Sequence, residues 1–388
     1  MSRHADAIVV GAGILGASTA YHLKEAGCEN VVLIERDQCA SGGTGKSAAI
    51  IRQHYSSQVA ARLTLDGIRM FTKLNDTLGL TEGFVQSGWR MLIPEPLMEA
   101  AAANVAMQRA LGIDTELIPV DGTDVPEWLN PDGVAGICYE SLGGYADPVR
   151  ITEAFVAGFE RAGGDYRSRT AVRSLRGDAG AVTGVDTDDG PLLSPIVVNA
   201  AGPWSKPLAE SVGLALPMRS VREQDTVWEA REGRPLPDTS ISNAVDAMYL
   251  RPLGGRRFVI GRGFPKEYED VDPYNYKTTP DEAFVSDVME RTEHRFPTLQ
   301  GARRIDAYCA LYDVTPDWMP FVGPRSGIAG YADANGGSGH GFKIGPAIGA
   351  ELARWLLEGE VADDFAGLSY DRIERGESFI GAYGGNRA

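Results

Sequence analysis

The first 35 residues contain the pattern that most narrows the folds open to this chain. A short apolar run at residues 8–10 leads into GAGILG at residues 11–16, and a second apolar run at residues 31–34 ends at Glu35. In such a strand–turn–helix–strand unit the glycines permit a tight turn and a close approach of a pyrophosphate, and the acid accepts hydrogen bonds from a ribose. A lone GxGxxG is a weak signal, but flanking strands and a correctly placed acid strengthen it. The unit predicts a parallel α/β fold that binds a dinucleotide.

Two later segments are expected to join the same sheet. Residues 196–202, IVVNAAG, form an apolar strand that ends in small residues, as expected where the backbone passes close to a ligand. Residues 327–333 predict another strand, which leads through the glycine-rich loop 335–341 into a helix over residues 344–357. Such a loop directs backbone N–H groups at a helix start, where the helix dipole favours an anion.

The middle of the chain has a different character. Asp147-Pro148 predicts the N-cap and first residue of a helix that runs to Ala162. The sequence TPDE at residues 279–282 predicts a capping box that opens a helix to about Arg295. Between these helices, residues 248–250 and 257–260 flank a Gly-Gly turn and predict a β-hairpin. A strand-rich segment between stretches of βαβ character indicates a second domain inserted into the first.

Composition excludes several classes of function. The 388 residues carry a net charge of -16, which argues against binding to nucleic acid or to anionic lipid. No apolar run approaches the roughly 20 residues that a membrane-spanning helix needs. Asp6 interrupts the basic region that a signal peptide would require at the N-terminus. Four cysteines without a CxxC pair predict neither a disulfide framework nor a thiolate metal site, and we expect a reducing, cytoplasmic location and no bound metal.

Two cations are candidates for an anion site. Lys343 follows the glycine loop at a helix start, where a cation is electrostatically misplaced unless an anion binds nearby; the alternative is a solvated surface lysine. Arg52 ends a small, apolar run and needs an anionic partner or solvent, so either a structural salt bridge or an anionic ligand would satisfy it. His54 is a weaker candidate that we place behind Arg52.

The combined motifs resemble the D-amino-acid oxidase-like family of FAD-dependent oxidoreductases. The resemblance covers nearly the whole chain, and within the family it is closest to sarcosine oxidase, the sarcosine oxidase β-subunit and the dimethylglycine-type enzymes. The segments that carry it are residues 11–16 with Glu35, SGGTGKSAAIIRQHY at 41–55, GYADP at 144–148, NAAG at 199–202, residues 315–324, and GSGHGFK at 337–343.

The resemblance implies an α/β fold, α+β overall, in which a Rossmann-like FAD-binding domain carries an inserted antiparallel-sheet substrate domain. The FAD-binding domain would comprise residues 1–84, 145–218 and 312–388, and the substrate domain residues 85–144 and 219–311. The implied reaction oxidises the C–N bond of a secondary or tertiary amino acid by hydride transfer to flavin N5, with imine formation. The acceptor of the electrons would be oxygen or an electron-transfer partner.

The resemblance also assigns site residues. Arg52 and Lys343 would hold the substrate carboxylate, Tyr249 and Tyr312 would lie near the substrate, and His54 would support them. The predicted FAD contacts are Gly11, Gly13, Ile14, Leu15, Gly16, Glu35, Arg36, Gly43, Thr44, Lys46, Ser47, Val172, Ala201, Gly202, Trp204, Gly337, Gly339, His340, Gly341, Phe342 and Lys343.

Four positions depart from the patterns of particular relatives. Ala310, Ser47 and Ala146 stand where relatives that attach their flavin covalently have a cysteine or a histidine, so we expect noncovalent FAD. Val259 stands where the monomeric oxidases have a lysine that activates oxygen, which leaves a dehydrogenase open. The alternatives are a flavin-carrying β-type subunit of a larger amino-acid dehydrogenase complex and, less favoured, a noncatalytic flavin-binding module.

Overall fold

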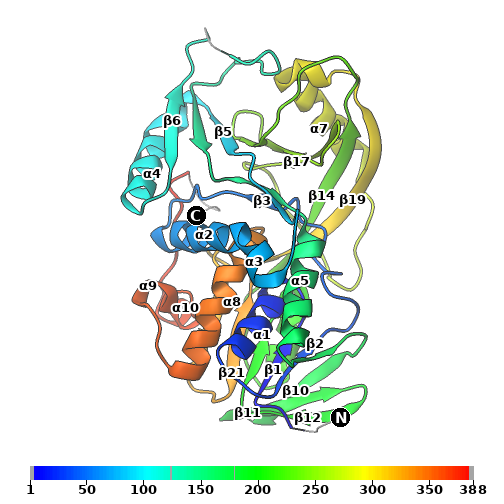
Figure 1. The fold of residues 1–388 in the computed structure, drawn as a ribbon, viewed down its shortest axis with the longest axis vertical. Helices are drawn as coiled ribbons and strands as arrows, with labels where there is room; N and C mark the ends of the chain where they lie inside the picture. The colour runs from blue at the N-terminus through cyan, green and yellow to red at the C-terminus, as the bar shows by residue number, and fades with distance from the viewer. Residues whose placement is uncertain (1–3, 123–124, 179, 384–388) are drawn as a thin grey trace.

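The chain contains two large sheets, which lie one above the other along the long axis of the molecule (Figure 1). The structure, a computed structural model, describes residues 4–122, 125–178 and 180–383. The six-stranded sheet lies in the lower half of Figure 1 and the nine-stranded sheet in the upper half. Among the described residues, no helix is both long and apolar enough to span a bilayer.

The six-stranded sheet contains the nucleotide-binding unit expected from the sequence. Its strand order is β20-β21-β13-β1-β2-β9, and all neighbours are parallel except β20 and β21. The strands are β1 (Ala7–Val10), β2 (Val31–Ile34), β9 (Asp165–Arg167), β13 (Val197–Asn199), β20 (Phe321–Pro324) and β21 (Tyr331–Asn335).

Both faces of this sheet are buried, which explains why its strands are continuous apolar runs. Ala7 and Val9 of β1 face the core formed with α1 (Ile14–Glu25), α5 (Pro148–Arg161) and α8 (Gly341–Glu358). Ile8 and Val10 face the opposite core, which is formed with α6 (Ser205–Glu210) and an antiparallel sheet. The strands of that sheet are β10 (Val172–Asp178), β11 (Ala181–Thr187) and β12 (Gly190–Leu193).

The nine-stranded sheet is mostly antiparallel and has two chemically different faces. Its strand order is β18-β14-β17-β16-β15-β5-β7-β6, with β19 paired to β14. One face packs its apolar side chains, among them Leu250 and Ile260, under α7 (Glu282–Arg295). The other face carries polar and aromatic side chains, and its Arg251 donates to the carbonyl of Ala146 on β8 at 2.7 Å. The strands are β5 (Trp89–Ile93), β6 (Thr115–Pro119), β7 (Gly136–Glu140), β14 (Arg219–Glu229), β15 (Ser240–Asn243), β16 (Met248–Pro252), β17 (Arg257–Arg262), β18 (Glu269–Asp270) and β19 (Arg303–Val314).

Shorter elements connect the two sheets. A small third sheet has the strand order β3-β8-β4. The nine-stranded sheet contacts it through the hydrogen bond from Arg251 to Ala146 on β8. The predicted domain boundaries remain a prediction. The strands of the six-stranded sheet fall in the ranges predicted for the FAD-binding domain, and those of the nine-stranded sheet fall wholly or mostly in the ranges predicted for the substrate domain. The remaining elements are β3 (Ile50–Ile51), α2 (Gln58–Thr72), α3 (Leu74–Leu78), β4 (Phe84–Val85), α4 (Met98–Ala110), β8 (Gly144–Ala146), α9 (Asp363–Ala366) and α10 (Asp371–Glu374).

Most of the local predictions are confirmed. The α/β class with a Rossmann-like sheet is present, the carboxylate of Asp147 accepts from two backbone N–H groups at the start of α5, and β16 pairs with β17 as a hairpin. The predicted capping box at residues 279–282 is wrong in its detail. The N-cap of α7 is Asp281, and its carboxylate pairs with Arg222 and Lys277 instead of capping the helix.

A buried ion pair fastens α10 to the loop that follows β19. The guanidinium of Arg372 donates to both carboxylate oxygens of Asp317, at 2.8 and 2.9 Å, and also to the carbonyl oxygens of Met319 and Pro320. The Arg372 and Asp317 side chains are 2% and 1% exposed. A buried carboxylate that loses its only cationic partner is strongly destabilising.

We therefore expect Arg372→Met to lower the free energy of unfolding by about 3–5 kcal/mol, measured by urea denaturation. Arg375→Met is the matched control, because Arg375 pairs with Glu377 only at the surface, where ion pairs contribute little. Equal midpoints for Arg372→Met and the control would show that the buried pair does not stabilise the fold.

Candidate functional site

One cleft of about 330 Å³ lies at the carboxyl ends of the parallel strands. Val10, Ile34 and Ala200, at the ends of β1, β2 and β13, all line it. Open parallel sheets bind their ligands at this edge. The cleft thus coincides with the position where the sequence motif places a dinucleotide.

The structure brings most of the predicted FAD contacts together around this cleft. Those that line it are Gly11, Gly13, Ile14, Leu15, Glu35, Arg36, Gly43, Thr44, Ser47, Val172, Ala201, Gly202, Trp204, Gly337, Gly339, Gly341 and Phe342, and Tyr312 joins them. Four predicted contacts do not line it: Gly16, Lys46, His340 and Lys343. The assignment of individual FAD contacts remains a prediction.

Close backbone packing leaves no room for side chains at the turn after β1. A Cβ atom on Gly16 would lie 1.9 Å from the carbonyl oxygen of Gly11, and a Cβ on Gly11 would lie 2.5 Å from that of Ala200. Gly16 therefore acts in packing rather than by lining the cleft. The turn leads directly into α1, and a helix N-terminus at this place suits the pyrophosphate of FAD.

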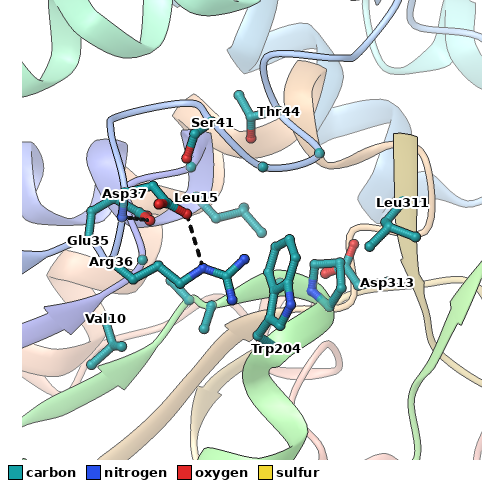
Figure 2. Close-up of a pocket in the computed structure, with 18 of the residues that line it drawn as sticks. Val10, Leu15, Glu35, Arg36, Asp37, Ser41, Thr44, Trp204, Leu311 and Asp313 are labelled. Carbon is teal, nitrogen blue, oxygen red and sulfur yellow. Dashed lines mark hydrogen bonds and ion pairs between the residues drawn. The ribbon is translucent and has the colours of Figure 1, made fainter. Parts of the chain in front are cut away.

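Charged and aromatic groups shape the end of the cleft beside β2 (Figure 2). Glu35 accepts hydrogen bonds from the backbone N–H groups of Ala12 and Asp37, at 2.9 and 3.0 Å. The Arg36 guanidinium lies over the Trp204 ring at 3.8 Å from its centroid, as Figure 2 shows. Glu35 thus holds the turn around the cleft in addition to its predicted role toward the ribose.

The other end of the cleft is formed by the glycine loop before α8. Asp313 accepts from the backbone N–H of Gly336 at 2.7 Å, and burial raises the pKa of this carboxyl. A Cβ on Gly339 would lie 2.7 Å from the Tyr312 ring, so only glycine allows the tyrosine to lie against the loop. The N-terminus of the 18-residue α8 therefore lies at the cleft, where its dipole favours negative charge.

Arg52 is half-buried and does not line the cleft, but Tyr55 connects it to the loop at this end. Its guanidinium donates to the carbonyl oxygen of His54 and lies over the rings of Tyr55 and Trp89, at 4.3 and 5.5 Å from their centroids. Within residues 4–122, 125–178 and 180–383, no carboxylate lies at ion-pair distance from it. The structural salt bridge is therefore not the role that this structure gives Arg52.

Lys343 is buried at the first turn of α8, with 8% of its surface exposed. The alternative of a solvated surface lysine is therefore wrong. Tyr55 connects this region to Arg52, because its hydroxyl is hydrogen-bonded to Nδ1 of His340 at 2.9 Å while its ring lies beneath the Arg52 guanidinium.

His54 lies behind Arg52 and is 2% exposed. Its Nε2 is hydrogen-bonded to the hydroxyl of Tyr383 at 2.5 Å. Burial, assisted by the charge of Arg52, lowers the pKa of His54 to about 3, so the imidazole is neutral at physiological pH. His54 can hold Arg52 and Tyr383 in place, but it cannot supply a proton near neutrality.

Sequence reasoning did not identify two buried carboxyl groups near the predicted substrate residues. Glu140 accepts from the backbone N–H of Gln53 at 2.6 Å, and burial raises its pKa to about 7. Asp225 accepts from the Tyr249 hydroxyl, and burial likewise raises its pKa to about 7. Neither acid belongs to a local motif, and only the pairing of distant strands brings them to the site.

Comparison with known proteins agrees with this architecture. The family model described as FAD dependent oxidoreductase matches residues 6–355. Human mitochondrial dimethylglycine dehydrogenase is 27% identical over 386 residues, and human mitochondrial sarcosine dehydrogenase is 26% identical over 382 residues. Each alignment covers 95% of this chain but only 44% and 41% of the relative, so the chain spans less than half the length of these relatives.

The fold of this chain is similar to that of a solved structure. The crystal structure of L-proline dehydrogenase from P. horikoshii superposes with a TM-score of 0.89 at 24% identity. The superposition covers 98% of this chain and all of that one. Both sheets therefore belong to one known architecture.

The Glu35 carboxylate gives a direct test of the cleft. Glu35→Ala removes an acceptor for ribose hydroxyls, worth about 1.5–3 kcal/mol, and we expect FAD to dissociate roughly ten- to a hundredfold more readily. The dissociation constant is measured by fluorescence titration of apoprotein. Glu29→Ala, an exposed acid in the turn before β2, should bind FAD as the wild type does. Unchanged affinity in Glu35→Ala would limit Glu35 to holding the turn.

Proposed function

Because this chain belongs to the FAD dependent oxidoreductase family, we propose that it oxidises the C–N bond of a secondary or tertiary amino acid, such as sarcosine or another N-methyl or cyclic amino acid. The observation that carries this proposal is Arg52, a half-buried guanidinium that lies on two aromatic rings beside the cleft. A planar guanidinium in such a place suits a carboxylate, which it can hold through two parallel hydrogen bonds.

In this proposal the chain binds and orients the substrate. Arg52 and Lys343, together called the carboxylate clamp, hold the substrate carboxylate, and Tyr249 and Tyr312 flank the amine. When bound, FAD would accept a hydride equivalent from the C–H next to the nitrogen, which leaves an imine that hydrolyses. The helix start at Gly341 and the carboxylate clamp supply fixed positive potential where negative charge accumulates.

A second function is favoured by one side chain. Val259, 2% exposed, occupies the position at which the sequence comparison expected an oxygen-activating lysine. This favours a flavin-carrying subunit that passes electrons to a protein partner. Purified chain that is reduced by substrate but turns over slowly with oxygen would support it. A noncatalytic flavin module would show no reduction by any amine.

The registers of β14 and β19 support noncovalent FAD. Ala310 pairs with Glu223 and Tyr312 pairs with Val221, so both lie on the polar face of the sheet. Cys309 is offset by one residue, is fully buried, and faces the opposite side. Cys309, the cysteine next to Ala310, therefore points away from the cleft. At the position where some relatives have an attaching histidine, this chain has Ser47, which lines the cleft.

Acid precipitation tests this assignment. We expect the protein to purify yellow and trichloroacetic acid to release the flavin into the supernatant, where its absorption is measured. Colour that remains in the pellet would disprove noncovalent binding, and Cys309→Ala would then show whether this thiol is the attachment point.

We also propose a reducing, cytoplasmic location. It is supported by the four cysteines, Cys28, Cys39, Cys138 and Cys309, all of which are unpaired with one another in the structure. Two relatives are described as mitochondrial, so cell fractionation decides between compartments.

The carboxylate clamp makes a quantitative prediction. Arg52→Met and Lys343→Met each leave a desolvated carboxylate short of a partner, at about 2–5 kcal/mol. The efficiency of anaerobic flavin reduction by sarcosine, dimethylglycine or proline should then fall roughly thirty- to several-thousandfold. The double variant should lose less than the sum, because both groups hold one anion.

Arg90→Met is the matched control, because Arg90 lies on β5 beside Trp89 but points to the opposite face and contacts Thr239. It should reduce at the wild-type rate, and FAD should remain bound in all variants. An amine without a carboxylate that reduces the wild type faster than any amino acid would overturn the proposed function.

A further inference from the structure

The polar face of the nine-stranded sheet contains a hydrogen-bonded acid–phenol pair, and the proposed function gives no role to its acid. Asp225 on β14 pairs in register with Gly261 on β17, and Gly261 pairs with Tyr249 on β16. Cross-strand partners point to the same face of a sheet. The Tyr249 hydroxyl crosses the intervening glycine and donates to Oδ1 of Asp225 at 2.5 Å.

Gly261 is the residue that makes this contact possible. A Cβ atom there would lie 2.5 Å from the Tyr249 hydroxyl oxygen and 2.6 Å from Oδ1 of Asp225. Any side chain at this position would therefore displace one of the two partners. The absent side chain of Gly261 leaves the space in which the Tyr249 hydroxyl meets the Asp225 carboxylate.

The pair lies next to the residues assigned to the substrate. Tyr249 pairs in register with Ser242 on β15, and the Ser242 hydroxyl accepts from Nε1 of Trp89 at 3.2 Å. The Trp89 ring is the one that lies near the Arg52 guanidinium. On the other side, Tyr249 lies near Tyr312, which lines the cleft. Neighbouring residues therefore connect Tyr249 with Arg52 on one side and with the cleft on the other.

Asp225 is isolated from direct cationic partners. It is 4% exposed, and no lysine or arginine in the described part of the chain forms an ion pair with it. Lys266 forms an ion pair with the neighbouring Glu223 and acts on Asp225 only at longer range. The titratable and charged groups that interact with Asp225 come from β14, β16, β19 and the segment after β17: Glu223, Tyr249, Tyr308, Lys266 and, from the opposite face, Cys309. Arg251 and Asp306 lie near Tyr308, and Tyr312 lies near Tyr249.

The charge state of Asp225 decides the direction of the Tyr249 hydrogen bond. A carboxylate only accepts, so it fixes the Tyr249 proton toward itself and leaves the hydroxyl lone pairs available on the other side. A neutral carboxyl can donate to the hydroxyl, which then directs its own proton away. Burial raises the pKa of Asp225 to about 7 and raises that of Tyr249 further above its ordinary range, so the phenol stays neutral while the acid titrates.

We propose that Asp225 is a positioning residue that makes the Tyr249 hydroxyl a proton acceptor for the ammonium group of the amino-acid substrate. This inference rests on the proposed function. The N–H bond of the ammonium breaks and its proton binds Oη of Tyr249, while the proton of that hydroxyl moves to Oδ1 of Asp225. No electrons are transferred in this step. The nitrogen keeps its lone pair, which it needs to form the C=N bond when the adjacent C–H is oxidised.

The pH dependence of flavin reduction tests the proposal. In the wild type, the rate of anaerobic flavin reduction by the best amino acid of the panel should rise as Asp225 ionises, through about pH 7. Asp225→Asn should lose this rise and reduce about a hundredfold more slowly at pH 8, the lower range for proton transfer by a positioned group. The deficit should shrink above about pH 10, where a free aliphatic amine no longer needs a proton acceptor.

Two further variants separate the proposed role from a structural one. Tyr249→Phe should lose the same limb of the profile, and the double variant should be no slower than either single variant, because the two residues act in series. Tyr308→Phe is the matched control: Tyr308 pairs in register with Asp225 and lies near it, but forms no hydrogen bond with it among those the structure describes. It should keep the wild-type profile.

A measurement without turnover completes the test. Infrared difference spectra between pH 5 and pH 9 should show a protonated-carboxyl C=O band that titrates near pH 7, disappears in Asp225→Asn and shifts in Tyr249→Phe. If an amino acid reduces the flavin of the wild type and Asp225→Asn keeps the wild-type pH profile, the proposed role of Asp225 is wrong and the proposed function stands. If no amino acid reduces the wild type, the proposed function fails, and absence of the band would remove the pair as well.

Discussion

The close packing of α1 on α8 is the constraint on which the rest of the site depends. A Cβ atom on Gly349 would lie 2.2 Å from the Ser18 hydroxyl, and one on Gly345 would lie 2.9 Å from the Ile14 side chain. Small residues at these crossing points let the two backbones approach each other. Because Ile14 and Gly345 are both near the N-terminal ends of their helices, the contact also brings the turn after β1 and the glycine loop before α8 to one cleft.

The parts of the fold that are encoded locally could be predicted from the sequence. The GxGxxG turn with Glu35, the Asp147 cap and the β16–β17 hairpin each need only neighbouring residues, and each is present. The capping box before α7 failed because a residue distant in sequence intervenes: Arg222 of β14 binds the Asp281 carboxylate. Local rules describe a helix end correctly only when no stronger partner reaches it from elsewhere.

Candidate site residues could be predicted from the sequence where they belong to a continuous motif. They could not be predicted where only the pairing register of distant strands brings them to the site. Arg52 and Lys343 stand out because a cation in their local sequence needs an explanation. Asp225 has no such signal, since its meaning arises from two register pairings that join β14 to β17 and β17 to β16. The burial of Lys343 was likewise open, because it depends on packing around α8 rather than on its neighbours in sequence.

The order of strands in the six-stranded sheet has a consequence for biosynthesis. β1 precedes the other strands of this sheet, but its neighbour β13 follows nearly 190 residues later and β21 only after residue 330. Pairings so distant in sequence form slowly, since long loops must close before any contact rewards them. During translation, β1 and β2 therefore leave the ribosome long before β13, which pairs with the other edge of β1. The cleft, lined by residues from Val10 to Phe342, exists only when most of the chain has emerged, and flavin binding is a late event in folding.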